Sequence, residues 1–420
     1  MAGTVETQGE LRWYMGGVAS YFFGSGIQTV LFPWLLTFYL HQPASRVGIA
    51  QMLAMLPMLV LGLFGGAKAD RAELRAHLMR LQLANALVPA TLAGLFFTDL
   101  LTYEALIACT FLGSAIGAFT MPARDSLLTK VAARSLAGRI QQAVTMATGM
   151  QFLSQVVGLV AGGAAVVLGA APLMIFHAVA LLLAAFTTYK LPPAPVTHSH
   201  QDKPPVSRMA QIREGFDVVW RSESIRPVVL LMFLSGILYI GVFMVLFPIL
   251  IRDVYAGSSL ELAFINICFF GGIGVSSMVQ SRLRPIRRQG RAIMCAMCMG
   301  SITMVFLHFH PPLWAVFMLV LGWGLSAGVS MSQSRAIVQM GATDSHRARV
   351  LSVFQLGSMG GGPIGALMIG FVITKLGPLN AVLVPSSCMV VLWLSIFFFT
   401  KLWRVEVSHG SASGQAGKTA

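Results

Sequence analysis

Apolar residues in this chain form long runs separated by short polar gaps. Each run is about 17–25 residues long, which is the length that crosses a bilayer as a helix. Lipid offers the backbone no hydrogen-bond partner, and barrel strands would alternate apolar and polar residues, so the runs predict helices. We therefore expect an all-α membrane protein with twelve transmembrane helices. The predicted spans are 15–40, 47–66, 78–97, 101–121, 141–168, 172–190, 227–250, 260–280, 292–308, 313–332, 351–374 and 379–400.

A longer polar segment, 191–226, separates the first six runs from the last six. Prolines in its first part favour extended backbone. In its second part, apolar residues from Met209 to Trp220 recur at helical spacing among charged residues, which predicts an amphipathic helix on the membrane surface. The predicted organisation is an N-terminal six-helix half (1–190), a cytoplasmic linker (191–226), a C-terminal six-helix half (227–400) and a cytoplasmic tail (401–420).

Basic residues lie on one side of this predicted topology. The chain has 29 Lys and Arg against 15 Asp and Glu, a net charge of +14. All but Arg46, Arg252 and Lys375 fall in the N-terminus, alternate gaps, the linker or the tail. Loops rich in Lys and Arg stay on the cytoplasmic side, so we expect a multi-pass protein of the cell (inner or plasma) membrane with both termini cytoplasmic. Because this pattern accounts for the charge, no nucleic-acid partner is expected.

Composition agrees with a membrane protein and argues against an enzyme. Hydrophobic residues make up 56% and charged residues 10%, whereas soluble domains have about 45–50% and about 25%. The lipid bilayer is therefore the expected surrounding. The predicted spans contain no nucleophile–base pair and no cluster of metal ligands, so no enzymatic activity, catalytic residue, metal or cofactor is expected.

The segment between the second and third spans carries a recognisable motif. It reads Gly66-Ala67-Lys68-Ala69-Asp70-Arg71-Ala72-Glu73-Leu74-Arg75. It resembles G-x-x-x-D-R-x-G-R-R, the signature loop of the major facilitator superfamily, in the expected loop of a six-plus-six arrangement. Gly66, Asp70, Arg71 and Arg75 match, whereas Glu73 and Leu74 replace a glycine and an arginine.

Three further segments resemble one branch of that superfamily, the bacterial exporters related to the enterobactin exporter and to macrolide and drug efflux proteins. They are 121–128 after the fourth span, 213–216 in the linker, and 347–366, which leads into the eleventh span. Two antiporter features of the superfamily are altered, because Cys109 and Leu159 stand where an arginine and a proline are frequent. These departures leave open whether protons are coupled to transport.

The resemblance implies a secondary active transporter, an exporter of a small amphiphilic molecule such as a drug, siderophore or metabolite, working by alternating access. The expected partners are this small-molecule substrate, the bilayer and, as an open alternative, coupled protons; a monomer is expected. A non-transporting sensor of the same fold is the main alternative, followed by a membrane enzyme. Substrate identity and the direction of transport are not determined by the sequence.

The signature loop suggests an inner gate. The resemblance implies that Asp70 contacts the start of the eleventh span, near Arg349, in the outward-facing state. A carboxylate there would be stabilised by the partial positive charge at the helix N-terminus. Asp125, after the fourth span, would hold Arg75 in place of the arginine missing at Leu74. Together with Gly66 and Arg71 these residues form the predicted gate.

Polar and aromatic side chains inside the spans suggest a substrate cavity. Polar groups are costly in lipid, so they favour the interior of the bundle. Gln151 and Gln155 are four residues apart and therefore share one helix face. The alternative for each polar residue is a hydrogen bond between helices, and for each aromatic residue it is lipid contact. The predicted cavity residues are Gln28, Phe111, Gln151, Gln155, Tyr239, Asn266 and Gln355.

This topology can be tested with reporter fusions. A reporter fused after Ser207, in the linker, should lie in the cytoplasm, and one fused after Asp99, between the third and fourth spans, should lie outside, because basic residues gather on the linker side. Labelling with a membrane-impermeant reagent reads out both positions. Labelling of both fusions from the same side of the membrane would contradict the twelve-span topology.

Overall fold

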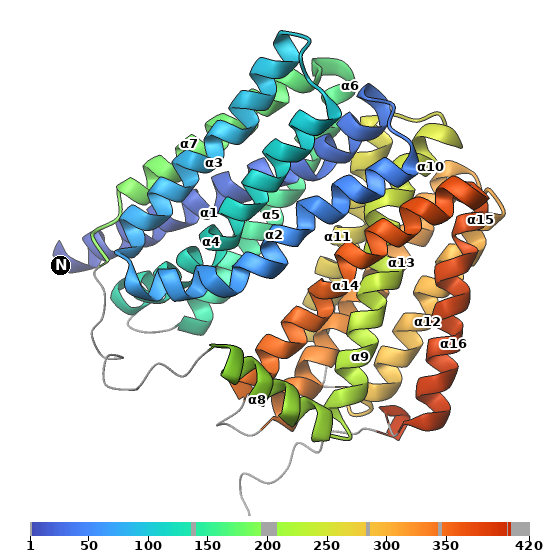
Figure 1. Ribbon diagram of the computed structural model, residues 1–420. Helices are drawn as coiled ribbons and strands as arrows, with labels where there is room; N and C mark the ends of the chain where they lie inside the picture. The colour runs from blue at the N-terminus through green and yellow to red at the C-terminus, as the bar shows by residue number, and fades with distance from the viewer. Residues whose placement is uncertain are drawn as a thin grey trace, which may run out of the picture.

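The computed structural model describes residues 2–135, 140–194, 208–282, 286–342, 347–400 and 402–404, and it is helical throughout, with no strand in these ranges (Figure 1). The helices in chain order are α1 (Ala2–Trp34), η1 (Leu35–Tyr39), α2 (Ala44–Arg71), α3 (Leu74–Phe97), α4 (Tyr103–Ser135), α5 (Ile140–Gly163), α6 (Ala165–Leu168), α7 (Ala170–Tyr189), α8 (Arg208–Arg221), α9 (Ile225–Ser235), η3 (Gly236–Ile240), η4 (Val242–Leu246), α10 (Phe247–Asp253), α11 (Ser259–Arg282), α12 (Gln289–His308), α13 (Leu313–Gly341), α14 (Arg347–Leu376), α15 (Pro378–Ala381), α16 (Leu383–Phe399) and η5 (Leu402–Arg404).

Within the described residues, 11 helical segments are long and apolar enough to cross a membrane. The segment Ile225–Asp253 counts as one of them and joins α9, η3, η4 and α10. The first predicted span, 15–40, lies on α1 and η1 and is not among the 11. Glycine, serine, tyrosine and glutamine interrupt its apolar residues and lower its mean hydropathy.

Helix breaks follow local chemistry. Gly169 and Gly377 have positive φ values of 78° and 76°, which a glycine adopts without steric cost, and each lets the chain turn before a new helix. Pro33 lies just before the π-helical turn η1, where the Thr37 hydroxyl donates a hydrogen bond to the Pro33 carbonyl oxygen at 2.7 Å. The Thr37 hydroxyl competes with the backbone for this carbonyl, which is a local cause of an irregular turn.

Most helix contacts occur within two sets, α1–α7 and α9–α16. In the first set α1 packs on α5 and α7, and α2 packs on α4; in the second α11 packs on α13, and α12 packs on α13 and α16. The sets meet mainly through α2 with α14 and α5 with α11. In Figure 1 they lie close together near α6, α10 and α15 and diverge toward α8 and the N-terminus.

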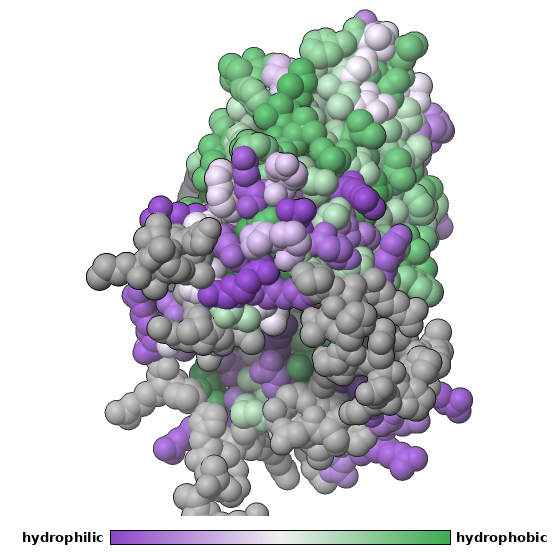
Figure 2. All heavy atoms as spheres, turned by 90° about the vertical axis from the view of Figure 1, so that its left-hand side faces the viewer, coloured by the Kyte–Doolittle hydropathy of each residue, from purple (hydrophilic) through white to green (hydrophobic). Residues whose placement is uncertain are grey.

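We name the two ends of the bundle by these features. The closed end contains residues 37–48, 163–170 and 252–260, where the sets meet. Among the described residues, the basic end contains 68–75, 124–134, 208–226, 282, 286–291, 335–342 and 347–349, with most of the Lys and Arg. Figure 2 shows one side of the molecule, where hydrophobic residues cover the upper part and hydrophilic residues gather across the middle, toward the basic end.

Candidate functional site

The closed end is held by an arginine that joins the two helix sets. Arg252, in the last turn of α10, donates from Nη1 to the carbonyl oxygens of Thr37 at 2.8 Å and Gln42 at 3.1 Å. Its remaining donors contact the neighbouring carboxylate of Asp253. One guanidinium therefore satisfies two backbone carbonyls, one in η1 and one in the turn between η1 and α2, where the α-helical pattern of hydrogen bonds ends.

A second connection lies beside it, between α5 and α11. Ser259 is fully buried; its hydroxyl donates to the Gly163 carbonyl oxygen at 2.8 Å and accepts from the Val166 N–H at 2.9 Å. Apolar residues Val30, Leu159, Leu262 and Ala263 pack in one cluster next to this contact. The Ser259 hydroxyl thus satisfies backbone groups at the break between α5 and α6.

The signature loop lies at the basic end, at the junction of α2 and α3. The side chains of Gly66, Asp70 and Arg71 are outside the described part of the structure, although their backbone belongs to α2. Arg75 is described: its Nη1 donates to the Leu191 carbonyl oxygen at 3.0 Å, and its guanidinium lies 6.0 Å from the centre of the Tyr189 ring. The structure therefore places Arg75 on the start of the linker.

Glu73, which replaces a glycine of the signature motif, caps α3. Its carboxylate accepts from the N–H groups of Arg75 at 3.2 Å and Ala76 at 2.6 Å, and also from Ala194 at 2.7 Å. The Leu74 N–H donates to the Ala194 carbonyl oxygen at 3.3 Å. The replacement thus fastens residues 191–194 to the start of α3.

The surroundings of Glu73 favour its charged form. Partial burial alone would raise the pKa of its carboxyl, but the hydrogen bonds from Ala194, Ala76 and Arg75, together with the Arg75 charge, outweigh that effect. The net result is a lowered pKa. Glu73 therefore holds the linker as a carboxylate at neutral pH.

Asp125 lies next to Arg124, a buried cation that the sequence analysis placed in the segment after the fourth span. Helix α4 runs on to Ser135, so residues 122–135, beyond the predicted end at 121, are also helical and lie at the basic end. Arg124 is consequently inside α4, with its side chain only 8% exposed and its Nη2 3.5 Å from Asp125 Oδ1. Its guanidinium lies 4.5 Å from the Phe22 ring centre and 5.5 Å from that of Tyr21.

The Arg124 guanidinium is incompletely satisfied. Its Nη2 contacts Met121 Sδ at 3.1 Å, while its buried Nη1 has no hydrogen-bond partner among the described residues. The Tyr14 hydroxyl donates to the Arg124 carbonyl oxygen at 3.0 Å. A buried charge with an unused donor inside a membrane bundle is a candidate functional group.

Arg349 contacts the linker helix in this structure. Its Nη1 forms an ion pair with Glu214 Oε1 of α8. A Cβ at the adjacent Gly215 would lie 2.8 Å from the Arg349 carbonyl oxygen, so only glycine allows this approach without a shift. Two segments that the sequence analysis noted separately, 213–216 and 347–366, therefore pack against each other.

Three of the predicted cavity glutamines are half-buried on helices of the first set. Gln151 and Gln155 are half-buried and lie on the α5 face that also carries Gly158, which packs on α1, and Leu159, which packs near α11. Gln28 is also half-buried. It follows Tyr21 by seven residues and Tyr14 by fourteen, so it shares their side of α1, which faces α4.

The other predicted cavity residues have different environments. Phe111 is 40% exposed on α4, and Gln355 is exposed near the start of α14, with Nε2 3.8 Å from Met359 Sδ. Asn266 is buried and donates to the Leu262 carbonyl oxygen of its own helix at 2.8 Å. Tyr239 is buried, with its hydroxyl 2.9 Å from Ser301 Oγ and 3.2 Å from the Met297 carbonyl oxygen.

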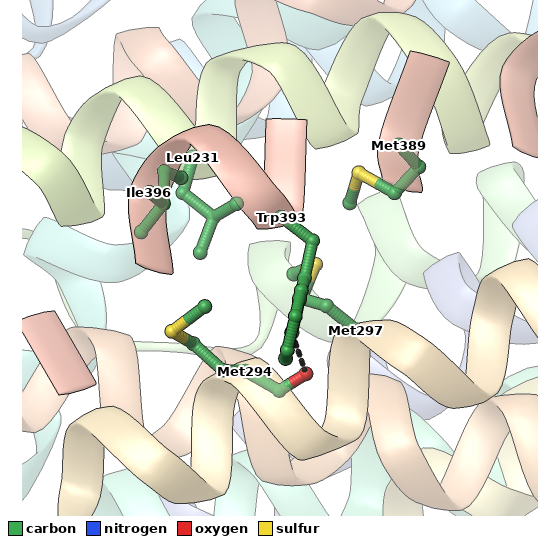
Figure 3. A pocket seen from close by; sticks show the side chains of 6 residues that line it. All are labelled: Leu231, Met294, Met297, Met389, Trp393 and Ile396. Atoms are coloured by element: carbon green, nitrogen blue, oxygen red, sulfur yellow. Dashed lines mark hydrogen bonds between the residues drawn. The ribbon is translucent and has the colours of Figure 1, made fainter. Parts of the chain in front are cut away.

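Two hollows lie away from these residues. One, between α9, α12 and α16, has no room for a water molecule; it is filled by methionines around Trp393, whose indole N–H donates to the Met294 carbonyl oxygen at 3.1 Å (Figure 3). The other is an open groove of about 600 Å³ on α1, α5 and α7. Its residues are Ala19, Ser20, Phe23, Leu153, Ser154, Val157, Phe176, Val179, Ala180 and Leu183.

Comparison with known proteins identifies the family. The sequence model described as Major Facilitator Superfamily matches residues 14–366. The multidrug efflux pump Tap of Mycobacterium tuberculosis is 27% identical over 356 residues, which cover 83% of each chain. The staphyloferrin A transporter of Staphylococcus aureus is 22% identical over 402 residues, covering 93% of this chain and 96% of that protein.

The fold agrees with solved structures of this class. The crystal structure of the nucleoside transporter NupG superposes with a TM-score of 0.74 at 12% sequence identity, covering 95% of this chain and all of that one. The two proteins share the fold of a helical bundle with many membrane-spanning segments. The chain belongs to the Major Facilitator Superfamily, and it is similar to members named as efflux pumps.

The Arg252 contact predicts a change in conformation on mutation. Arg252→Gln removes the charge and the fork of donors that bridges Thr37 and Gln42. Hydrogen bonds from a charged group contribute about 1.5–3 kcal/mol, so the closed-end contact should weaken about tenfold or more. Electron spin resonance distances between labels at Leu100 and Trp314, both exposed at this end, should shift toward longer values.

Arg46 provides the matched control for this experiment. It also lies at the closed end, but its Nη1 donates to Gln42 and its guanidinium lies over the Tyr103 ring, so both contacts stay within the first helix set. Arg46→Gln should leave the distances unchanged. Equal distributions in the wild type and in Arg252→Gln would show that Arg252 does not hold the two sets together.

Glu73 predicts a pH-dependent stability. Loss of a helix-capping side chain costs about 1 kcal/mol, so Glu73→Gln should lower the Tm of the detergent-solubilised protein at pH 7. Because the folded pKa of Glu73 is lowered, its contribution is present above the ordinary glutamate pKa of about 4.3 and is lost as pH falls through the folded value. The difference in Tm should therefore shrink on acidification.

Glu104→Gln serves as the control, since it removes an exposed carboxylate from the first turn of α4. Its Tm should differ little from that of the wild type at either pH. A Glu73→Gln variant as stable as the wild type at pH 7, or a difference that grows as pH falls, would contradict the anchoring role.

Proposed function

We propose that this protein is a secondary active transporter that exports a small amphiphilic molecule, a drug, siderophore or metabolite, by alternating access between two six-helix halves. The observation that carries this proposal is the uneven contact between helix sets α1–α7 and α9–α16. Hydrogen bonds through Arg252 and Ser259 join them at the closed end. At the basic end, Glu73 and Arg75 bind the linker start and Arg349 pairs with Glu214 of α8, so these contacts do not join the two sets.

In this proposal α1 and η1 form the first of twelve spans, and the basic end faces the cytoplasm, as do both termini. The structure then corresponds to a state open to the cytoplasm. Relatives named as a multidrug efflux pump and as a staphyloferrin A transporter support export of a small molecule. The protein would work as a monomer, with protons as the candidate coupling ion.

The transport path would run between the sets, past the polar faces of α1, α4 and α5. Gln28, Gln151 and Gln155 would supply hydrogen bonds to the substrate, and Arg124 would supply a positive charge nearer the basic end. Phe111, Tyr239, Asn266 and Gln355 belong to the proposed path in other states of the cycle. Rocking about the closed end would alter the exposure of these side chains.

The inner gate of this proposal depends on a change of partner. In the state described here Arg349 pairs with Glu214. When the basic end closes, Asp70 would approach the first turn of α14, where the helix N-terminus and Arg349 both attract a carboxylate. Gly66, Arg71, Arg75 and Asp125 would complete the gate around it. The Glu214–Arg349 pair then favours the open state in competition with Asp70.

The proposed path is tested by transport in proteoliposomes. Gln151→Leu and Gln155→Leu should each lower the transport rate about two- to tenfold, the range expected for one lost hydrogen bond, and still insert because leucine suits lipid. A panel of antibiotics and siderophores, with imposed proton gradients of either direction, supplies the substrates. Gln142→Leu, an exposed position on the same helix, is the matched control.

Two outcomes would count against the proposal in different ways. Wild-type rates in both glutamine variants would mean that this face of α5 serves packing and that the path lies elsewhere. Absence of transport by the wild-type protein across the whole panel, in both gradient directions, would favour a non-transporting sensor of the same fold.

A further inference from the structure

Helix α8 has two differently used faces. One face is docked: Gly215 and Val219 are buried, and α8 packs on α14 and α9. The other is open: Phe216 and Trp220 are each 51% exposed and stack on one another, with ring centres 5.6 Å apart and planes at 15°. An exposed, ordered aromatic pair is costly in water and matches the boundary between headgroups and acyl chains.

Positive charge surrounds this aromatic pair. Arg213 and Arg221 are exposed on α8, and the guanidinium of Arg226, at the start of α9, lies 5.8 Å from the Trp220 ring centre. Asp217 is the exposed acidic residue among them, and Glu223 follows the helix. The three arginines outnumber these carboxylates, so the open face favours an anionic surface.

The position of α8 suits a helix of the membrane interface. Figure 1 shows α8 lying across the ends of the second helix set at the basic end, crosswise to the long helices rather than parallel to them. A helix that combines apolar aromatics with arginines and lies crosswise at the end of a membrane bundle matches the geometry of an interfacial helix. A helix at this position can present its aromatic side to the leaflet at the basic end.

The docked face connects α8 to the start of α14. Glu214 pairs with Arg349, and Gly215 lies directly against the Arg349 carbonyl group. Movement of α8 relative to the leaflet therefore changes the position of the first turn of α14. That turn is also the element on which the proposed inner gate closes.

We propose that the open face of α8 binds anionic phospholipid headgroups through Arg213, Arg221 and Arg226, with Phe216 and Trp220 inserted beside them, and that this binding holds the basic end open through the Glu214–Arg349 pair. The lipid acts as a regulator of the conformational equilibrium. Lipid binding by α8 does not depend on which molecule is transported, or on the direction of transport.

The test uses the full-length protein in phosphatidylcholine nanodiscs with and without phosphatidylglycerol. Spin labels at Thr129 and Met340, both exposed at the basic end of different helix sets, report its opening. Phosphatidylglycerol should increase the long-distance population. A separate label at Asp217 should show greater oxygen and lower nickel-complex accessibility when phosphatidylglycerol is present, as expected for a helix drawn into the interface.

Variants separate lipid binding from its transmission. Each arginine removed should weaken association with the anionic surface about fivefold, so Arg213→Gln/Arg221→Gln should require more phosphatidylglycerol for the same shift. Glu214→Gln should keep the lipid-dependent insertion at Asp217 but lose the distance response. Arg282→Gln, which removes an exposed charge at the same end outside α8, should respond as the wild type does.

Several results would overturn the proposal. They are an Asp217 label that stays in water with both lipid mixtures, an unchanged phosphatidylglycerol response in the double arginine variant, and an equal response in Arg282→Gln and the double variant. A distance shift produced by inorganic phosphate in phosphatidylcholine nanodiscs would assign the effect to a free anion instead of the leaflet. Because the readouts measure insertion and distance, they remain valid whether or not the protein transports any tested compound.

Discussion

Helices in lipid gain little from burying apolar side chains against one another, so close backbone contact holds this bundle together. Gly26 of α1 and Gly158 of α5 face each other across one such contact, and Gly48 of α2 lies against Ala366 and Gly370 of α14. The first contact lies within one helix set, and the second joins the two sets. Both place bare backbone at a helix–helix contact, so these small residues permit close packing.

Polar contacts decide which end of this packing stays together. At the closed end the second helix set provides hydrogen-bond donors, Arg252 and Ser259, to carbonyl groups of the first set. At the basic end, Arg75 and Glu73 bind residues 191–194, and Arg349 of the second set pairs with Glu214 of α8, so these contacts do not join the two sets. The asymmetry of these partners explains why the sets meet at one end.

The sequence predicted the elements that depend on short-range patterns. Long apolar runs locate the helices, and the helical spacing of 209–220 corresponds to α8, because both signals are contained in neighbouring residues. The family resemblance is confirmed by the match over residues 14–366. Helix ends were less predictable: the polar residues that end an apolar run near 121 continue as helix to Ser135, which moved Arg124 from an expected loop to a buried site.

Contacts between distant residues were beyond the sequence analysis. The Glu214–Arg349 pair joins positions 135 apart, and nothing in either segment specifies its partner. Arg252 was counted only as one of three basic residues on the sparse side, since its charge was visible but its carbonyl partners were not. In the sequence, Glu73 was only a departure from the signature motif, where a glycine is expected. In the structure its carboxylate caps α3 and accepts a hydrogen bond from the Ala194 N–H of the linker.

Charge also sets a constraint on closing the basic end. Arg75, Arg124 and Lys130 lie on the first set near this end, and Arg349 and Arg335 lie on the second, in a chain with about twice as many basic as acidic residues. Bringing the sets together concentrates like charges in a region that loses water, where their repulsion strengthens. Closure of this end would therefore need carboxylates or a bound anion between the sets, and a carboxylate that is already paired, as Glu214 is with Arg349, offsets less of that repulsion. The divergence of the two sets toward the basic end agrees with this shortage of acidic partners as well as with the contacts at the closed end.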